Sequence, residues 1–494
     1  MHGKSTTRLL PTRREMMLWT IFCACIARHP VAAAEPKPLP DLSTRKGEDW
    51  GEFLGPTGNG RSGLPDMQVP WPAAGPKLVW NCTLGEGYCA PAVARGRAIV
   101  FDRVDNTMRV RCLEAESGRP LWEHSYASTY RDSFGYDGGP RAGPVIAGDR
   151  VITFGPEGRL ECRSLADGQS LWHIDTQARY HVVQNFFGVG AAPLVIEVDG
   201  NQYVVVQVGG SRPDSAPAAP DRLDLVKGLD SGLVAFDLAT GLERWRSSSQ
   251  LASYSVPVVA TIGGDQRLLA WMRDAFLVVD PATGGVLDEF HWRADELFSV
   301  VAASPVVRGS EVLLSETYGP GSVLLNLTND RVNVVRKDRD NQRPRNALKA
   351  HWATPAVYEG HLYGSSGRNS GDAELVCVDW KTGEVVWNEP GLGRASVVVV
   401  GSHLIVLGEF GDVVLVKATP EKYVEVSRTR PLHTNRTPKR RAGQADAEQQ
   451  EPAGELLAPP CWAAPVVAHG YLYLRGQGRL VCFDLIGARV QTRF

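Results

Sequence analysis

The sequence lacks the features that mark several large classes of protein. Its 53 lysine and arginine residues are matched by 55 aspartate and glutamate residues, so no basic excess is present to hold nucleic acid over a wide face. It contains no His-Glu-x-x-His, phosphate-loop or Gly-x-Ser-x-Gly motif, which leaves zinc-protease, nucleotide-binding and serine-hydrolase chemistry unsupported. No run is apolar and long enough for a membrane-spanning helix, which needs about 20 residues. We therefore expect neither a nucleic-acid partner nor a transmembrane segment.

Residues 1–34 have the pattern of a secretory signal peptide. Three arginines precede an apolar run at residues 16–27, and three alanines follow before Glu35. Residues 12–18 (TRREMML) resemble a twin-arginine signal, although adjacent arginines also arise by chance in such segments. We expect an exported chain, periplasmic or extracellular, that begins with a lead-in at residues 35–76.

One unit of about 50 residues recurs along the chain. Its first half is a proline with an apolar pair, a turn containing glycine and a second apolar run. Seven prolines mark such starts: Pro91, Pro144, Pro193, Pro257, Pro305, Pro355 and Pro465. The last two are 110 residues apart, twice 55, which predicts an eighth start without proline at residues 396–400.

The second half of the unit carries a turn and a tryptophan. Cys or Ala is followed by Asp and Thr-Gly, and Trp stands four residues after the glycine, as in residues 235–245 (AFDLATGLERW). Short alternating strands at this period, with no helix, predict an all-β fold, an eight-bladed β-propeller of four-stranded antiparallel blades. The tryptophans expected to lie flat against the next blade are Trp80, Trp122, Trp172, Trp245 and Trp387.

The eighth unit ends near Leu485 without a tryptophan after its turn. The missing strand is expected at the other end of the sequence, where residues 77–80 (KLVW) precede the first unit. We expect this N-terminal strand to complete the last blade, so that the propeller spans residues 77–485 and leaves a tail at 486–494.

Two further segments depart from the repeat. Residues 330–349 are charged and are expected to replace the turn and tryptophan of the fifth unit. Residues 428–454 are polar and poor in apolar side chains, which predicts a disordered loop.

Seven cysteines remain after the predicted signal peptide. Four occupy one position of the repeat and are expected to be small buried core residues: Cys112, Cys162, Cys377 and Cys482. Cys82, Cys89 and Cys461 lie elsewhere, and the sequence leaves open whether one pair of them is bonded.

The A/C-x-D-x-x-T-G-x-x-x-W units resemble the pyrroloquinoline-quinone-type propeller repeat over residues 77–485. Residues 50–56 (WGEFLGP) resemble the lead-in of exported bacterial proteins that carry this repeat. The resemblance implies the fold more strongly than the function, since the family includes quinoprotein alcohol dehydrogenases and BamB-like assembly factors of the outer membrane. Its enzymes usually carry a vicinal Cys-Cys disulfide, a bound Ca²⁺ and an Asp base. This sequence has no adjacent cysteines, so no catalytic residue, cofactor or metal ligand is carried over.

One set of positions predicts a ligand site. The residues three before the marker prolines are Tyr88, Arg141, Gly190, Tyr254, Ala302, Trp352 and Trp462. If the units superpose, these residues surround one mouth of the central channel, together with Tyr136 and Asp137. Aromatic side chains and a guanidinium can grip a peptide, a glycan or a planar ligand by stacking and cation–π contact. The alternative is that the aromatics only pack between blades.

These observations favour an exported, non-catalytic propeller that binds or scaffolds a protein or small ligand in the cell envelope, similar to BamB-like proteins, without a cofactor. Two alternatives remain open. One is a quinone-dependent alcohol dehydrogenase, which would need pyrroloquinoline quinone and Ca²⁺. The other is a carbohydrate- or peptide-binding sensor.

Overall fold

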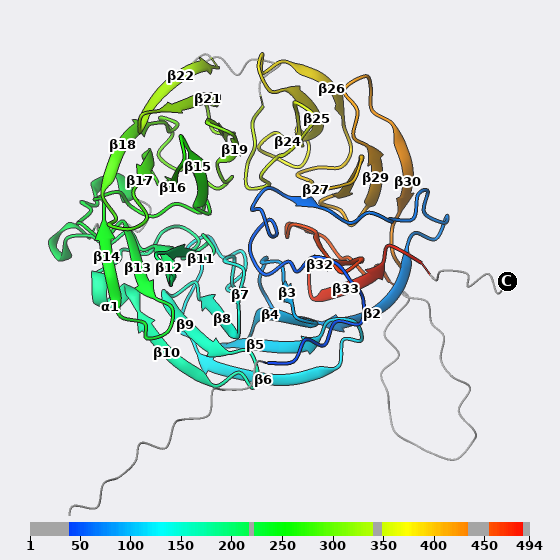
Figure 1. Ribbon diagram of the computed structural model, residues 1–494, viewed down its shortest axis with the longest axis horizontal. Helices are drawn as coiled ribbons and strands as arrows, with labels where there is room; N and C mark the ends of the chain where they lie inside the picture. Colours follow the sequence, from blue (N-terminus) through cyan, green and yellow to red (C-terminus); the bar gives the residue numbers. More distant parts are fainter. Residues whose placement is uncertain (1–38, 217–221, 339–347, 433–453, 488–494) are drawn as a thin grey trace, which may run out of the picture. The chain divides into compact units, whose positions relative to one another are not determined.

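The computed structural model describes residues 39–216, 222–338, 348–432 and 454–487. These residues form eight sheets around a central axis, and the sheets follow one another in chain order (Figure 1). The predicted eight-bladed propeller is confirmed. The predicted signal peptide lies outside the described residues. Within the described ranges, no helix is long and apolar enough to cross a membrane.

Each blade takes its strands from a continuous stretch of chain, with the innermost strand first. The first four blades are β3 (Ala92–Ala94), β4 (Arg97–Val104), β5 (Thr107–Glu114), β6 (Pro120–Ala127); β7 (Val145–Ala147), β8 (Arg150–Phe154), β9 (Arg159–Ser164), β10 (Ser170–Asp175); β11 (Leu194–Val198), β12 (Asn201–Gln207), β13 (Leu233–Asp237), β14 (Glu243–Ser247); and β15 (Val258–Ile262), β16 (Asp265–Trp271), β17 (Ala275–Val279), β18 (Val286–His291).

The next three blades follow the same plan, and the eighth borrows its outer strand. They are β19 (Val306–Arg308), β20 (Glu311–Glu316), β21 (Gly321–Thr328), β22 (Arg331–Lys337); β23 (Ala356–Tyr358), β24 (His361–Ser366), β25 (Glu374–Asp379), β26 (Val385–Glu389); β27 (Ser396–Val400), β28 (His403–Leu407), β29 (Val413–Lys417), β30 (Glu425–Thr429); and β31 (Val466–Ala468), β32 (Tyr471–Gly476), β33 (Arg479–Asp484) with β2 (Lys77–Thr83). The start predicted without a proline is β27.

The connections contain a little helix that the repeat does not predict. α1 (Thr176–Tyr180) follows β10, and the carboxylate of Asp175 accepts a hydrogen bond from the backbone N–H of Ala178 at 2.9 Å. This side chain satisfies one of the open donors of the first helical turn. Two 3-10 helices, η1 (Pro213–Ser215) and η2 (Leu223–Leu225), lie between β12 and β13 of the third blade.

The third blade shows why the turn motif recurs. The Asp237 carboxylate accepts hydrogen bonds from the backbone N–H (2.8 Å) and hydroxyl (2.6 Å) of Thr240. Gly241 has a φ of +71°, which glycine adopts without strain. A register irregularity after Ala235 places Trp245 opposite that residue. The turn and the irregularity together direct the indole toward the next blade.

Five tryptophans lie between blades, at the positions where the repeat expects them. Each indole N–H donates a hydrogen bond of 2.9–3.0 Å to a backbone carbonyl of the next blade: Trp80 to Ala115, Trp122 to Leu165, Trp172 to Leu238, Trp245 to Pro281 and Trp387 to Thr419. Four of these rings press on a turn glycine, where an added Cβ would lie within 2.5–2.7 Å of the nearest atom: Gly118, Gly168, Gly241 and Gly284. The glycine therefore serves both the turn and the contact between blades.

Two blades fill the tryptophan position with a charged residue. In the fourth blade, Asp288 accepts a hydrogen bond from the backbone N–H of Val332 in the fifth (2.8 Å). In the fifth blade, Arg336 lies against Gly383 and donates to the Trp380 carbonyl at 3.2 Å. The guanidinium thus makes the two contacts that an indole makes elsewhere: it packs on a turn glycine, and its N–H donates a hydrogen bond to a backbone carbonyl.

This arrangement corrects the expectation for residues 330–349. The segment begins with the outer strand β22 itself, because the hairpin turns at Asn329 and Asp330, both with positive φ. Most side chains of β22 are exposed, and Arg331, Arg336 and Lys337 give it the charged composition of a loop.

The seventh blade has Ser427 at the tryptophan position, opposite Leu415. Trp71 of the lead-in fills the place instead. Its backbone N–H donates to the Ser427 hydroxyl at 3.0 Å, and its side chain is buried. β30 extends to Thr429, so its end overlaps the predicted loop at 428–454, of which residues 433–453 lie outside the described residues.

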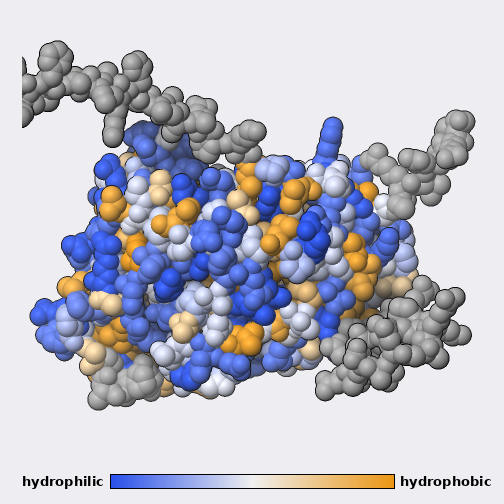
Figure 2. All heavy atoms as spheres, turned by 90° about the horizontal axis from the view of Figure 1, so that it is seen from below, coloured by the Kyte–Doolittle hydropathy of each residue, from blue (hydrophilic) through white to orange (hydrophobic). Residues whose placement is uncertain are grey.

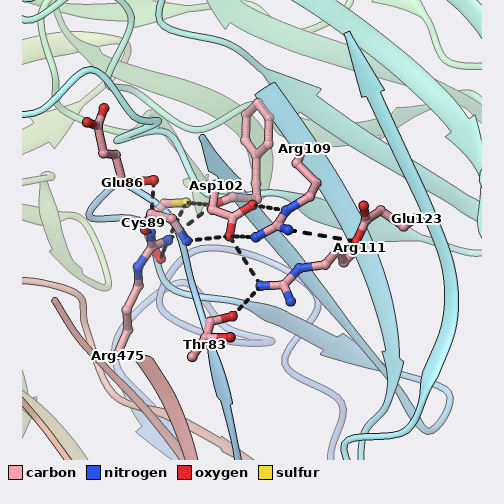
Figure 3. Close-up of polar contacts among 10 residues, drawn as sticks. Thr83, Glu86, Cys89, Asp102, Arg109, Arg111, Glu123 and Arg475 are labelled. Carbon is pink, nitrogen blue, oxygen red and sulfur yellow. Dashed lines mark hydrogen bonds and ion pairs between the residues drawn. The ribbon is translucent and has the colours of Figure 1, made fainter. Parts of the chain in front are cut away.

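The ring closes through β2, as the sequence predicts. β2 pairs antiparallel with β33, and Trp80 lies opposite Cys482. Figure 3 shows the adjoining contact between the last and first blades, where Arg475 of β32 donates to the Cys89 carbonyl at 2.8 Å. It also donates to the Phe101 carbonyl at 3.1 Å. One guanidinium therefore joins the eighth blade to two points of the first.

Asp102 lies beside this junction and is fully buried. It accepts two hydrogen bonds from Arg109 (2.7 and 2.9 Å), one from Arg111 (3.2 Å) and one from the Gly85 N–H (2.7 Å) (Figure 3). Burial alone would raise the pKa of Asp102, but these donors hold it below its ordinary value. The carboxylate is therefore charged and fully paired.

The lead-in crosses one end of the ring. Trp50 exchanges backbone hydrogen bonds with Val93 of β3, the Gly51 carbonyl accepts from Ile146 of β7, and β1 (Arg61–Ser62) pairs in parallel with β27. Figure 1 shows this stretch, in blue, running near the centre of the ring. Residues 50–62, called the floor segment below, thus connect the innermost strands of the first, second and seventh blades.

All seven cysteines in the described part of the chain are free thiols. The four at the repeat position are fully buried, as expected. The pairing left open for Cys82, Cys89 and Cys461 is not formed: the Cys89 thiol donates to the Phe101 carbonyl (3.4 Å) and the Cys461 thiol to the Leu457 carbonyl (3.7 Å). Strand pairing, not a disulfide, closes the ring.

The outer wall is mainly hydrophilic. Along β6 the side chains alternate between exposed and half-buried. Successive side chains of a strand point to opposite faces of the sheet, and only one face of this outermost strand packs on its neighbours. Figure 2 shows hydrophilic residues interspersed with scattered apolar ones on this view of the wall.

Removal of one interblade indole tests the packing scheme. We expect Trp245→Ala to lower the free energy of unfolding by about 3–5 kcal/mol, because it opens a void between two blades. Trp245→Phe keeps most of the ring and loses the N–H bond to Pro281, so its cost should be about 1–2 kcal/mol. Denaturant unfolding measures both, and equal losses in the two variants would contradict the scheme.

Candidate functional site

A cavity of about 540 Å³ lies along the axis of the ring. Its base is the floor segment, including Trp50, Glu52 and Leu54, and its walls are the starts of the innermost strands. Its other end is surrounded by the connections that lead into the blades. We call the cavity the cup and its aromatic-lined end the rim. Its size falls within the range of small-molecule and peptide pockets.

Eight of the nine residues predicted to surround the mouth of the channel line the cup: Tyr88, Tyr136, Arg141, Gly190, Tyr254, Ala302, Trp352 and Trp462. The structure does not place Asp137 among them. Its carboxylate is buried and accepts hydrogen bonds from the backbone N–H groups of Gly87 (3.0 Å) and Gly139 (2.6 Å). Short acidic side chains commonly hold turns in this way, and this explains why Asp137 is drawn away from the cup.

Half of the rim is a run of touching aromatic rings. The Trp462 ring lies 4.7 Å from Tyr88 and 4.9 Å from Trp352, centre to centre. Trp352 lies 4.4 Å from His351, whose Nε2 is 3.0 Å from the hydroxyl of Tyr318. These rings pack on one another around the cup, whereas the interblade tryptophans pack on the turn glycines of the next sheet.

The other half of the rim is built around Phe187. Its ring lies 5.7 Å from Tyr254 and 6.0 Å from Tyr136, and its backbone N–H donates to the Tyr254 hydroxyl at 2.8 Å. Arg141 connects the two halves, since its guanidinium lies 5.5 Å from the Tyr88 ring and 5.0 Å from the Phe187 ring. Tyr136 is 66% exposed and stands at the outer edge of the rim.

Arg394 also lines the cup and was not predicted. Its guanidinium lies 4.6 Å from the Trp352 ring and 5.0 Å from the Trp462 ring, and it forms an ion pair with Glu409. The indole N–H of Trp462 donates to the same carboxylate at 2.9 Å. Burial opposes ionisation of Glu409, but the donors from Arg394 and Trp462 lower its pKa to about 2.

The sequence held a signal for Arg394. Tyr358 of β23 pairs with His361, and Val400 of β27 pairs with His403, so these two pairs are equivalent. By this register Val397 takes the place of a marker proline, and Arg394 stands three residues before it. The position was overlooked because the seventh unit has no proline from which to count.

Arg368 of the sixth blade is the third arginine of the cup. Its guanidinium lies 4.4 Å from the Tyr318 ring and 3.0 Å from the Glu296 carboxylate. Burial, reinforced by Arg394 and Arg368, lowers the pKa of His351 to about 3. His351 is therefore neutral across the physiological range.

Glu52 is the carboxylate at the base. Burial raises its pKa to about 7. No hydrogen bond or ion pair joins its carboxylate to another of the described residues, although three arginines line the same cup.

A family model described as outer membrane protein assembly factor BamB matches residues 68–213 and 108–389. The chain belongs to this family. The BamB of Burkholderia pseudomallei is 27% identical over 196 residues, which cover 37% of this chain and half of that protein. The resemblance of the repeat to the pyrroloquinoline-quinone type is thereby confirmed.

Solved structures resemble this BamB-family chain in fold. Quinohemoprotein alcohol dehydrogenase from Comamonas testosteroni superposes with a TM-score of 0.60 at 12% identity, over 90% of this chain and 82% of that one. BamB from Moraxella catarrhalis superposes with a TM-score of 0.50 at 14% identity, over 84% of this chain and all of that one. At these identities the likeness shows the fold alone.

The residues of the cup do not fit a quinone held by Ca²⁺. Calcium takes six to eight oxygen ligands, several of them carboxylates, and Glu52 is the lone carboxylate in the lining among the described residues. No group of three His, Cys, Asp or Glu side chains able to hold a metal occurs in the described part of the chain. Cys89, the sulfur in the lining, is an unpaired thiol.

The raised pKa of Glu52 predicts that the free energy of unfolding decreases as the pH rises. The folded state holds the proton more tightly than the unfolded state, so stability falls as the pH rises from about 4.5 to about 7. Glu52→Gln should therefore be more stable than the parent at pH 8, by at most about 3 kcal/mol at 1.4 kcal/mol per pKa unit, and close to it at pH 4.5. Urea unfolding at both pH values measures this. Glu86→Gln, which removes an exposed carboxylate, serves as the control, and a difference that does not vary with pH would refute the assignment.

Proposed function

We propose that this BamB-family propeller is a non-catalytic binding protein of the cell envelope, and that it holds a projecting segment of a partner protein in the cup. The observation that carries the proposal is the rim of contacting aromatic rings around a cavity whose base is the floor segment. Aromatic and arginine side chains are enriched among the residues that dominate protein recognition, and aromatic rings bury large surfaces with few rotatable bonds. The rim residues lie in the short connections that lead into the innermost strands and pack on one another, so little order is lost on binding.

Support for a protein as partner comes from the family. The matching relatives are named as assembly factors of outer membrane proteins. The envelope location rests on the same relatives and on the pattern of residues 1–34. The chain spans half the length of the curated relative, so its partner is part of the proposal.

Support for a non-catalytic role comes from the polar groups of the rim. Glu409 and Arg394 are bound to each other, and His351 has lost its basicity through burial. A general base needs a pKa near the working pH and a free lone pair aimed at the substrate, and neither rim group offers both. Glu52 of the floor segment has a pKa of about 7, so this support is confined to the groups of the rim.

Peptide selection tests the proposal directly. We expect a random peptide library to yield peptides that bind the purified protein and that lose at least tenfold in affinity for Trp352→Ala, at an unchanged melting temperature. Trp352 is part of the rim, and loss of one well-packed aromatic contact commonly costs 1–2 kcal/mol or more. Isothermal titration measures the affinity.

Tyr358→Ala is the matched control, because Tyr358 contacts Arg61 at the floor end of the ring, away from the rim. It should leave peptide affinity unchanged. Peptides that bind Trp352→Ala as well as the parent would overturn the rim as the binding site, and Trp352→Ala that only lowers the melting temperature would assign the aromatics to packing.

The dehydrogenase alternative has its own test. We expect purified protein titrated with pyrroloquinoline quinone and Ca²⁺ to show neither stoichiometric binding in the absorbance of the quinone nor dye-linked alcohol oxidation, since the cup supplies one carboxylate to a metal. Saturable binding together with dye reduction would overturn the non-catalytic proposal.

A further inference from the structure

The positive charges of the cup are already compensated. Arg141 forms an ion pair of 2.8 Å with Asp132, and Arg368 one of 3.0 Å with Glu296. Arg394 is paired with Glu409. Each guanidinium also lies over an aromatic ring. An anionic ligand would therefore have to compete with a carboxylate that is already in place at every arginine.

Glu52 is the one charged group of the described lining without a counterpart. It stands on the floor segment beside Trp50, Phe53 and Leu54, so its immediate neighbours in the sequence are glycine and apolar residues. A carboxylate in such a setting is costly to ionise unless a cation or several donors approach it. The closed base of the cup thus offers an acceptor that the protein itself does not fill.

We infer that the cup accepts an amine-bearing group, a lysine side chain or a chain amino terminus of the partner, with the ammonium at Glu52 and the apolar stem between the rings of the rim. The inference rests on the proposed function, because it specifies what the inserted segment carries. It follows from two observations taken together: aromatic rings surround the rim of the cup, and a single carboxylate without a partner stands on its floor.

Ammonium groups suit both parts of this site. Aromatic faces attract cations, and the attraction is stronger where water is excluded. An ammonium donates up to three hydrogen bonds, and an ion pair at a buried base is screened less than one at the surface. A lysine stem is a flexible apolar chain that can lie along the rings while its charge reaches the floor.

Binding of a lysine side chain, or of another amine that stays protonated, should strengthen as the pH rises from about 6 to 8, whereas a chain amino terminus loses its own proton near the top of this range. Free Glu52 loses its proton over this range, and the ionised form is the one that pairs with an ammonium. The other ionisable groups that line the cup are the three arginines, the tyrosines, His351 and Cys89. Burial raises the pKa of Tyr88 and of Tyr318 to about 12 and lowers that of His351 to about 3. None of these three titrates between pH 6 and 8, so the pH dependence reports Glu52.

Three probes with one indole ring and different charges test the inference. Tryptamine is a cation, indole-3-acetamide is neutral and indole-3-acetate is an anion. At pH 8 we expect tryptamine to bind the full-length protein at least tenfold more tightly than indole-3-acetate, with the acetamide between them. Glu52→Gln should bring tryptamine to the level of the acetamide and remove the change between pH 6 and 8, whereas Glu86→Gln should bind like the parent.

The outcomes separate the inference from the function on which it rests. If all three probes bind alike and Trp352→Ala weakens them all, the cup is a binding site without charge preference, and the inference fails while the proposed function stands. If indole-3-acetate binds most tightly, or if Glu52→Gln keeps the preference for tryptamine, the inference is overturned. If no probe binds, or if Trp352→Ala weakens none of those that bind, the cup fails as the site, and both are overturned.

Discussion

The contact between a turn glycine and the residue packed on it from the preceding blade is the constraint on which the rest of this molecule depends. Sheets that fan around an axis diverge toward the outside, and the gap between them must be filled by something wide and flat. An indole with its N–H on a carbonyl meets that need five times, and Arg336 meets it once with a guanidinium. At five of the eight contacts between blades the filler packs on a turn glycine. The connections that lead into the innermost strands are thereby held around one cavity, where they form the rim.

The repeat made it possible to predict the fold from the sequence, and the blades that depart from the repeat show where such prediction fails. The spacing of the prolines was sufficient to find β27 without its proline, and the unpaired final unit was sufficient to assign β2 to the last blade. The same logic failed at the fifth blade, since an outer strand that is mostly exposed and carries three charged residues has the composition of a loop. A guanidinium in place of an indole could be identified only once Arg336 was seen against Gly383.

The site was predictable to the extent that it follows the symmetry of the ring. Counting from the prolines located the rim tyrosines and tryptophans, and an alignment by strand register would have added Arg394. Glu52 obeys no repeat. It reaches the cup because the floor segment pairs with β3 and β27, strands that lie about 300 residues apart in the chain, and a local pattern carries no information about such a pairing. Asp137 shows the opposite limit, because proximity in the chain suggested a ligand contact where the side chain instead secures a turn.

The origin of the floor segment has a consequence for how the molecule is made. Residues 50–83 are synthesised before the first blade, yet β1 and β2 find their partners only in the last two blades. A chain that emerges from one end must therefore keep these strands unpaired until nearly all of it has been synthesised, and contacts of such long sequence separation form slowly. During that interval the nascent polypeptide exposes strand edges that invite association with other chains. Pairing of the two ends only after the last blades have been synthesised, with β1 and β2 protected by a chaperone until then, would be the natural biogenesis of a ring that is closed by an N-terminal strand.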